Sequence, residues 1–103
     1  MSSSFTAELS TIAAEIQGII QNVPDPTIAQ GITTDSRSIQ VGELFVALRG
    51  ENFDGHDCVA MAIAQGARAA IVDGEFDAGD LPVIVVADTL KAYQTIARWW
   101  RRK

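Results

Sequence analysis

The chain has 103 residues, of which 48% are hydrophobic and 20% are charged. This balance is typical of one globular domain with a modest core, and it excludes a disordered chain. No apolar run approaches the roughly 20 residues of a membrane-spanning helix, and the first residues lack the pattern of a signal peptide. We therefore expect no membrane partner and a cytoplasmic location.

Charge is unevenly distributed along the chain. All 13 acidic residues precede Lys91, whereas five of the eight basic residues lie in the segment from Lys91 to Lys103. A mostly acidic surface argues against a nucleic-acid partner, and the basic end suits the last turn of a helix, where the helix dipole favours cations. The single cysteine, Cys58, cannot form a disulfide within one chain and is interpreted as a small, half-buried hydrophobe.

The first predicted element is a helix over residues 6–21. Its apolar residues fall on one stripe at helical spacing: Leu9, Ile12, Ala13, Ile16, Ile19 and Ile20. Pro24 and Pro26 end the helix, because proline cannot continue the hydrogen-bond ladder. A short strand is predicted over residues 28–34, followed by a polar turn with Gly42 as its pivot.

Three continuous apolar runs, residues 44–48, 69–72 and 83–86, predict strands covered on both faces. A loop over residues 50–55 follows the first run. A helix then begins near His56 or Asp57 and ends at Gly66, and its buried residues are expected to be Val59, Ala62 and Ile63. Residues 73–80 are expected to form an acidic surface loop.

A final helix is predicted after residue 86, with Asp88 or Thr89 as its cap. Its apolar stripe is expected to be Leu90, Tyr93, Ala97 and Trp100. The alternation of strands and helices from residue 44 onward predicts an α/β fold in which a small sheet, at least partly parallel, is flanked by helices. We expect residues 1–103 to form a single domain.

Two polar clusters follow predicted strands, and ligands of α/β sheets bind at the carboxyl ends of strands. The first is Thr34-Asp35-Ser36-Arg37. Arginine offers a planar fork of donors to phosphate oxygens, and the hydroxyls and turn amides add further donors. The alternative is an Asx or Ser/Thr turn with a surface salt bridge.

The second cluster runs from Gly50 to His56. Its two glycines let backbone approach a ligand closely, Asn52 can pair with a nucleobase edge, and Phe53 can stack on a base or ribose. The alternatives are ordinary ones, in which Phe53 belongs to the core, Asp54-Gly55 is only a turn, and His56 or Asp57 only caps a helix.

The clusters do not assemble a standard catalytic or metal site. Ser36, His56 and an aspartate lack the Gly-x-Ser-x-Gly elbow of a hydrolase, and His56 with Asp54 and Asp57 is a poor metal set because no second histidine exists. The phosphate-binding Gly-x-x-x-x-Gly-Lys-Ser/Thr loop and the Gly-x-Gly-x-x-Gly motif are both missing. We expect no catalytic residue, no metal ligand and no cofactor of its own in this chain.

The stretch TTDSRSIQVGELFVALRGENFDGHDCVAMAIAQGARAAIV resembles the amino-terminal domain of the Mur ligases, which build the peptide stem of bacterial peptidoglycan. The resemblance rests on Asp35-Ser36-Arg37, Val41-Gly42-Glu43, Leu44 to Leu48, Gly50-Glu51, Asp54 to Asp57 and Gly66-Ala67. Two positions depart from the family pattern: Val41 replaces a frequent proline, and Cys58 replaces a frequent aromatic residue. The segment Val85 to Leu90, followed by a helix to Trp100-Arg101, is most similar to the family member that adds D-alanyl-D-alanine.

The resemblance implies a division of labour within a longer ATP-dependent amide ligase. This domain would grip the UDP end of UDP-N-acetylmuramoyl-peptide, a central domain would bind ATP and magnesium, and a carboxyl-terminal domain would bring the incoming group. The UDP-binding residues implied are Thr34, Ser36, Arg37, Gly50, Glu51, Asn52, Phe53, Asp54, Gly55 and His56, with Asp35 orienting Arg37. Two alternatives stay open: the sister ligase that adds the third stem residue, and a freestanding nucleotide-sugar-binding or interaction module.

Overall fold

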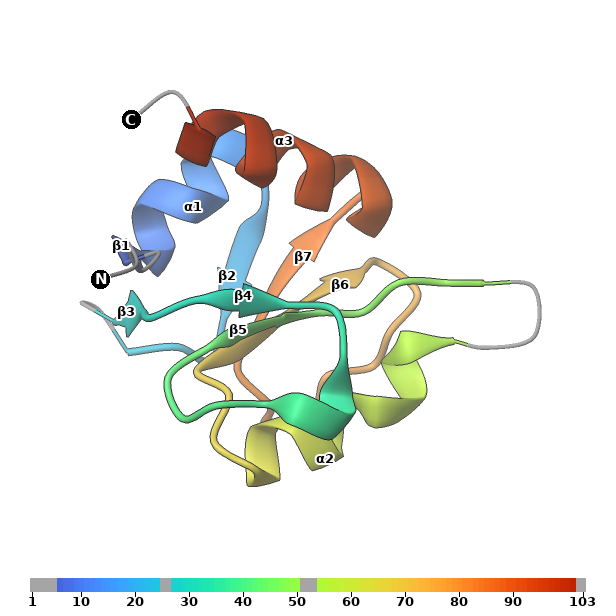
Figure 1. Cartoon of the computed structure of the whole chain (residues 1–103). Helices are drawn as coiled ribbons and strands as arrows, with labels where there is room; N and C mark the ends of the chain where they lie inside the picture. Colours follow the sequence, from blue (N-terminus) through green and yellow to red (C-terminus); the bar gives the residue numbers. More distant parts are fainter. Residues whose placement is uncertain (1–5, 25–26, 51–53, 102–103) are drawn as a thin grey trace.

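The computed structural model describes residues 6–24, 27–50 and 54–101, and the side chains as far as Trp99. Its centre is a five-stranded sheet with helices on both faces (Figure 1). The strands of this sheet are β2 (Ile19–Gln21), β4 (Ile32–Thr33), β5 (Leu44–Val46), β6 (Ala69–Asp73) and β7 (Val83–Val86). Helices α1 (Leu9–Ile16) and α3 (Thr89–Arg101) cover one face, and α2 (Val59–Ala64) covers the other.

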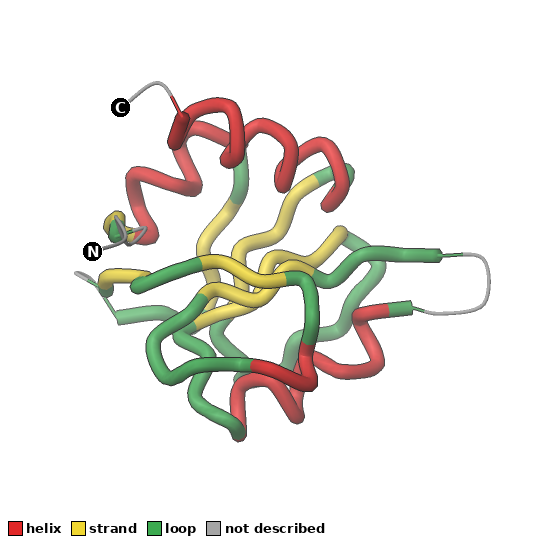
Figure 2. The backbone as a smooth tube through the Cα atoms, in the orientation of Figure 1, coloured by secondary structure: helices red, strands yellow, loops and turns green. Residues whose placement is uncertain are grey.

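The sheet order is β2-β7-β6-β5-β4, and the strands from β4 to β7 all run parallel. β2 is the outermost strand beside β7, and it alone in this sheet runs antiparallel to its neighbour. A separate two-stranded antiparallel ladder joins β1 (Ala7–Glu8) to β3 (Ile28–Ala29) (Figure 2). The predicted α/β class with a partly parallel sheet is therefore confirmed.

Two hydrophobic clusters hold the layers together, because successive strand residues point to opposite faces. Leu44, Val46 and Ile71 pack against α1 and α3, whereas Phe45 and Val72 pack against α2. Burial of both faces explains why the three predicted strands read as continuous apolar runs rather than alternating ones.

The helix predicted over residues 6–21 is confirmed only for Leu9–Ile16, because Ala7–Glu8 form β1 and the residues after Ile16 leave the helix. The helix ends at Ile16, Gln17 adopts a left-handed conformation (φ 57°), and the N–H of Gly18 donates to the Ala13 carbonyl oxygen at 2.8 Å. The chain then enters the sheet as β2. A Cβ atom at Gly18 would lie 2.4 Å from Ile84 Cγ2, so only glycine lets the chain pass this close to β7.

The predicted strand over residues 28–34 is divided into two. Gly31, with φ 140°, separates β3 from β4, which belong to different sheets. Gly42 has φ 95°, which confirms its place as the pivot of the following turn.

The helix expected at His56 or Asp57 begins as the 3-10 helix η2 (Gly55–Cys58) and continues as α2. Its predicted end is confirmed. The Gly66 N–H donates to the Ile63 carbonyl and the Ala67 N–H to the Ala62 carbonyl, with φ 119° at Gly66, which is the Schellman pattern of a helix end.

The predicted stripe of the last helix is partly wrong, because Leu90 is 50% exposed. The buried residues of α3 are instead Ala92 and Ile96, with Tyr93 and Trp99 packed beside them. Ala92, Ile96 and Trp99 follow one another at spacings of four and three, so they form one helical face, and Leu90 lies off it. Within residues 6–24, 27–50 and 54–101, no helix is long and apolar enough to cross a membrane.

Candidate functional site

The carboxyl ends of β4, β5, β6 and β7 lie along one edge of the sheet, because these strands are parallel and adjacent. The loops that leave this edge carry both polar clusters that the sequence singles out (Figure 1). The first cluster follows β4 and the second follows β5, so two segments separated in sequence emerge side by side.

The turn after β4 is organised by Asp35. Its Oδ1 accepts a hydrogen bond from the Arg37 N–H at 2.9 Å and caps the 3-10 helix η1 (Ser36–Ser38). Its own N–H donates to Thr33 Oγ1 at 3.1 Å. The turn is therefore fixed by its own side chains before any ligand is considered.

Arg37 forms a bidentate ion pair with Asp35, from Nε to Oδ1 at 3.1 Å and from Nη2 to Oδ2 at 3.3 Å. The Arg37 guanidinium lowers the pKa of the Asp35 carboxyl, chiefly through these side-chain hydrogen bonds. The Arg37 side chain is 88% exposed, and about three of its five N–H donors point to solvent, since the pair uses only two. Asp35 orients Arg37, as expected, and leaves it able to donate to an anion.

A cavity of about 640 Å³ lies beside this turn. It is lined by Thr34, Asp35, Ser36 and Arg37 from the turn, and by Cys58 and Met61 from η2 and α2. The structure thus brings Thr34, Ser36 and Arg37 to one cavity. Sequence reasoning missed Cys58 and Met61 as lining residues, although their i, i+3 spacing places them on one side of a helical segment.

The second cluster is described only in part, because Glu51, Asn52 and Phe53 lie outside the described residues. Gly50 is exposed at its start. At its end, Gly55 serves close backbone packing. A Cβ atom there would lie 2.8 Å from the Leu48 nitrogen, and the Gly55 N–H donates to the Leu48 carbonyl oxygen at 2.7 Å.

His56 is buried, with 6% of its surface exposed, and both ring nitrogens have protein partners. Nε2 accepts the backbone N–H of Asp73 at 3.1 Å, which assigns the ring proton to Nδ1 and makes Nδ1 the donor to Asp54 Oδ1 at 2.7 Å. The backbone N–H of His56 also donates to Asp54 Oδ1, and it is the main cause of the lowered pKa of Asp54. In this arrangement His56 shapes the loop and has no ring nitrogen free for a ligand.

Arg49 and Asp73 complete this cluster, and sequence reasoning missed both. Arg49 donates from Nε to Asp73 Oδ2 and from Nη1 to Asp54 Oδ2, each at 2.7 Å. Asp73 is the last residue of β6 and half-buried rather than the first residue of a surface loop, and its pKa is lowered chiefly by the hydrogen bond from Arg49. Arg49 follows β5 closely and Asp73 ends the neighbouring β6, so the strand order could have suggested their meeting.

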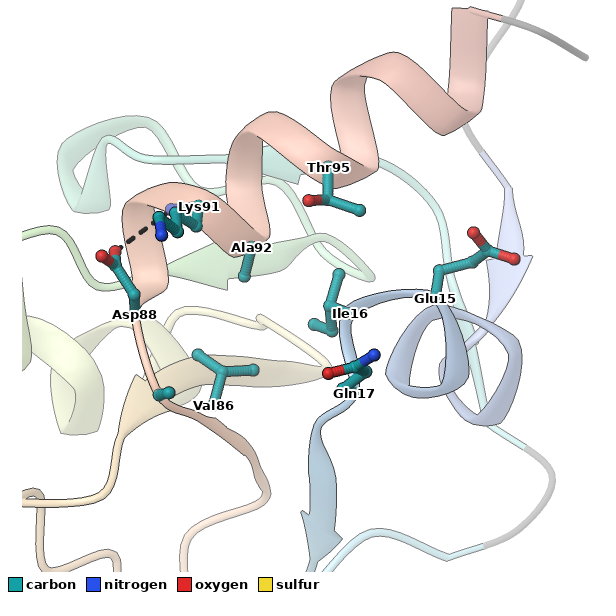
Figure 3. A pocket seen from close by; sticks show the side chains of 9 residues that line it. Glu15, Ile16, Gln17, Val86, Asp88, Lys91, Ala92 and Thr95 are labelled. Atoms are coloured by element: carbon teal, nitrogen blue, oxygen red, sulfur yellow. Dashed lines mark hydrogen bonds between the residues drawn. The ribbon is translucent and has the colours of Figure 1, made fainter.

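Two further hollows border the end of β7. One, of about 520 Å³, is lined by Arg49, Asp73, Gly74, Glu75, Val86 and Ala87. The other, of about 310 Å³, lies where Ala92 and Thr95 of α3 face Ile16 and Gln17 at the end of α1 (Figure 3). Beside it, Asp88 Oδ1 accepts the Lys91 N–H at 3.1 Å and caps α3, as expected. No described residue that was predicted to bind a ligand lines either hollow. Among the described residues, no group of three or more His, Cys, Asp or Glu side chains could hold a metal ion.

A family model described as "Mur ligase family, catalytic domain" matches residues 29–99 of the chain. The chain is 41% identical over 95 residues to UDP-N-acetylmuramoyl-tripeptide--D-alanyl-D-alanine ligase of Escherichia coli, covering 92% of this chain and 20% of that protein. It is 38% identical over 84 residues to UDP-N-acetylmuramoyl-L-alanyl-D-glutamate--2,6-diaminopimelate ligase of Bacillus licheniformis, covering 76% of this chain and 17% of that protein.

Solved structures agree with this likeness. A crystal structure of MurF from Acinetobacter baumannii matches 97% of this chain with a TM-score of 0.80 and 34% identity, over 22% of its own length. A second structure, of the D-alanyl-D-alanyl ligase from the same organism, matches 99% with a TM-score of 0.84 and 31% identity, over 23% of its length. The chain thus spans about a fifth of the length of the proteins it matches.

Proposed function

Because the chain belongs to the Mur ligase family, we propose that it is the amino-terminal, substrate-recognition domain of a MurF-type ligase. Its proposed task is to hold the UDP end of UDP-N-acetylmuramoyl-peptide. The observation that carries the proposal is the shared cavity of Thr34, Ser36 and Arg37 at the carboxyl edge of the sheet. Recognition of a nucleotide at this edge is what α/β sheets support physically, since turn amides and side-chain donors converge there.

The proposed roles follow from exposure and chemistry. Arg37 carries donors toward solvent and would meet the diphosphate, with the hydroxyls of Thr34 and Ser36 beside it. Cys58 and Met61 supply an apolar wall to the same cavity, against which a ribose or base could pack.

The second cluster would complete the pocket. Gly50, Glu51, Asn52 and Phe53 are proposed to line the uridine, partly through backbone groups. Asp54, Gly55 and His56 are proposed to hold that loop in place, because their polar atoms are engaged with one another and with the ends of β5 and β6.

The chemical step is proposed to lie in other parts of the longer protein. This sequence has no phosphate-binding loop, so ATP and magnesium would be bound outside these 103 residues. The reaction would form an acyl phosphate on the substrate and then an amide with D-alanyl-D-alanine. Binding of the remote UDP end would position the reacting carboxylate, and that binding energy supports the chemical step. A cytoplasmic location goes with this proposal, since the family acts on soluble nucleotide precursors.

The ligase that adds 2,6-diaminopimelate, the third stem residue, is the second candidate. Its relatives match with lower identity and over less of the chain than the D-alanyl-D-alanine ligase of E. coli does. Both ligases would bind the UDP end in the same way, so they differ in the incoming group that they add. A binding module without catalytic partner domains is the remaining candidate, and a longer protein with an ATP-binding domain would exclude it.

Titration of the chain with UDP and with UDP-N-acetylmuramic acid, followed by backbone amide NMR, tests the proposal. We expect shifts at residues 34–37 and 54–56, and an affinity at least about tenfold weaker in Arg37→Ala, because a charge-assisted contact to phosphate is lost. Arg68→Ala is the matched control, since Arg68 is exposed and precedes β6 at the opposite edge of the sheet. Two results would refute the proposal. One is amide shifts confined to the hollow where α3 faces the end of α1. The other is no amide shift at millimolar ligand in either this chain or a longer protein containing it.

A further inference from the structure

Arg49 lies at the centre of an ionic network that joins three segments of the chain. Its guanidinium contacts Asp54 at the start of η2, Asp73 at the end of β6, and Glu75 just beyond β6. The first two contacts are 2.7 Å long and the third is 3.6 Å. Nε, Nη1 and Nη2 each face a carboxylate, so the geometry of the guanidinium fixes where these segments lie relative to one another.

His56 makes a second connection between two of the same carboxylate residues. It donates to Asp54 through Nδ1, accepts from the Asp73 backbone through Nε2, and lies 3.7 Å from the Asp73 carboxylate. Among the described residues, Arg49 is the cation paired with these carboxylates. Without Arg49, the carboxylates of Asp54 and Asp73 would repel each other on either side of the His56 imidazole, with no paired cation to offset their charge.

We infer that Arg49 is a positioning residue, which holds the Asp54–Gly55–His56 segment against the end of β6 and acts on the candidate site through Asp54 rather than by touching a ligand. The inference rests on the proposed function only for the identity of that ligand. Direct contact with a phosphate is disfavoured here, since three carboxylates surround this one guanidinium and an anion would meet their charge.

Amide hydrogen exchange of the ligand-free chain tests the positioning itself. The reporters are the three N–H groups that close the network, those of Gly55, His56 and Asp73. In Arg49→Met we expect these to exchange about tenfold faster or more, because they open locally, whereas the Ala70 N–H in the centre of the sheet keeps its rate. If Arg49→Met destabilised the whole domain, the exchange rate of the Ala70 N–H would rise by the same factor. If the rates of the three reporters did not change, Arg49 would not hold the segment in place. Either result overturns the inference.

The matched control is Arg68→Met, which removes an exposed arginine outside the network and should change none of these rates. Arg49→Lys should fall between wild type and Arg49→Met, since lysine restores the charge without the planar fork.

UDP affinity then separates positioning from contact. We expect about tenfold weaker binding in Arg49→Met and in Asp73→Asn, and little further loss in the double variant, because both changes break one network. Additive losses would mean that Arg49 touches the ligand and would overturn the inference. If UDP binds neither to the wild-type chain nor to a longer protein containing it, the proposed function fails, while the exchange rates still decide whether Arg49 positions the segment.

Discussion

Substitution of Gly55 by alanine tests how tightly the second cluster is packed on β5. A Cβ atom at this position would lie 2.8 Å from the Leu48 nitrogen, 3.0 Å from the Leu48 oxygen and 3.1 Å from Ala47 Cα. These are backbone atoms, which cannot rotate away as a side chain can. Overpacking of this kind costs about 1–3 kcal/mol, and strain on the 2.7 Å bond from the Gly55 N–H to Leu48 adds about 1 kcal/mol. The lower entropy of the unfolded alanine chain returns about 0.4–1 kcal/mol.

We therefore expect Gly55→Ala to lower the free energy of unfolding by about 1–3.5 kcal/mol, which corresponds to a fall in Tm of roughly 5–25 °C for a domain of this size. Thermal unfolding followed by circular dichroism measures it. Gly74→Ala is the control, because Gly74 is exposed, no atom lies within 4 Å of its added Cβ, and its φ is not in the positive region. Equal Tm values for the two variants would refute the packing argument.

Two further predictions concern stability. Gln17→Gly should raise the free energy of unfolding by about 0.5–1 kcal/mol, because glycine relieves the left-handed φ of 57°. The control is Gln65→Gly, which should give no such gain, since Gln65 ends α2 at φ −85°. Urea unfolding compares the two variants, and a larger gain at Gln65 would contradict the reasoning. The lowered pKa of Asp73 means that its contribution to stability is complete above the ordinary value of 3.8 and is lost as the pH falls through the lowered pKa. In urea titrations between pH 2 and 7, Asp73→Asn should therefore flatten the acid side of the stability profile more than the exposed Asp80→Asn does, and identical profiles would count against the Arg49 pair.

The central strands could be read from the sequence because burial on both faces leaves a local signal. The runs at β5, β6 and β7 contain hardly any polar residue, and no helix pattern competes with them. The segment Ile19-Ile20 was different. These residues continue the stripe of α1 as well as they fit a strand, and the pairing of Ile20 with Ile84 in a distant strand decides between the two. A local hydrophobic pattern gives no information on contacts between residues far apart in the sequence.

The candidate site likewise has one part that could be predicted from local sequence and one part that could not. Asp35 and Arg37 interact within two residues of each other, so the turn and its ion pair follow from local sequence. Arg49 and Asp73 are 24 residues apart and meet only because β5 and β6 are neighbours. Their roles required the strand order, which was not predicted from the sequence; only an α/β fold with a partly parallel sheet was.

The pairing of β2 with β7 has a consequence for how the chain folds. Leu44 pairs with Ala69, and Ala70 with Val83, so the parallel centre closes over short stretches of chain. Ile20 must instead find Ile84, more than 60 residues away along the chain. Closing a longer loop costs entropy that the contact returns only after it forms, by about 0.6 kcal/mol for each doubling of length. The centre of the sheet should therefore assemble first, with β2 and α1 joining it late.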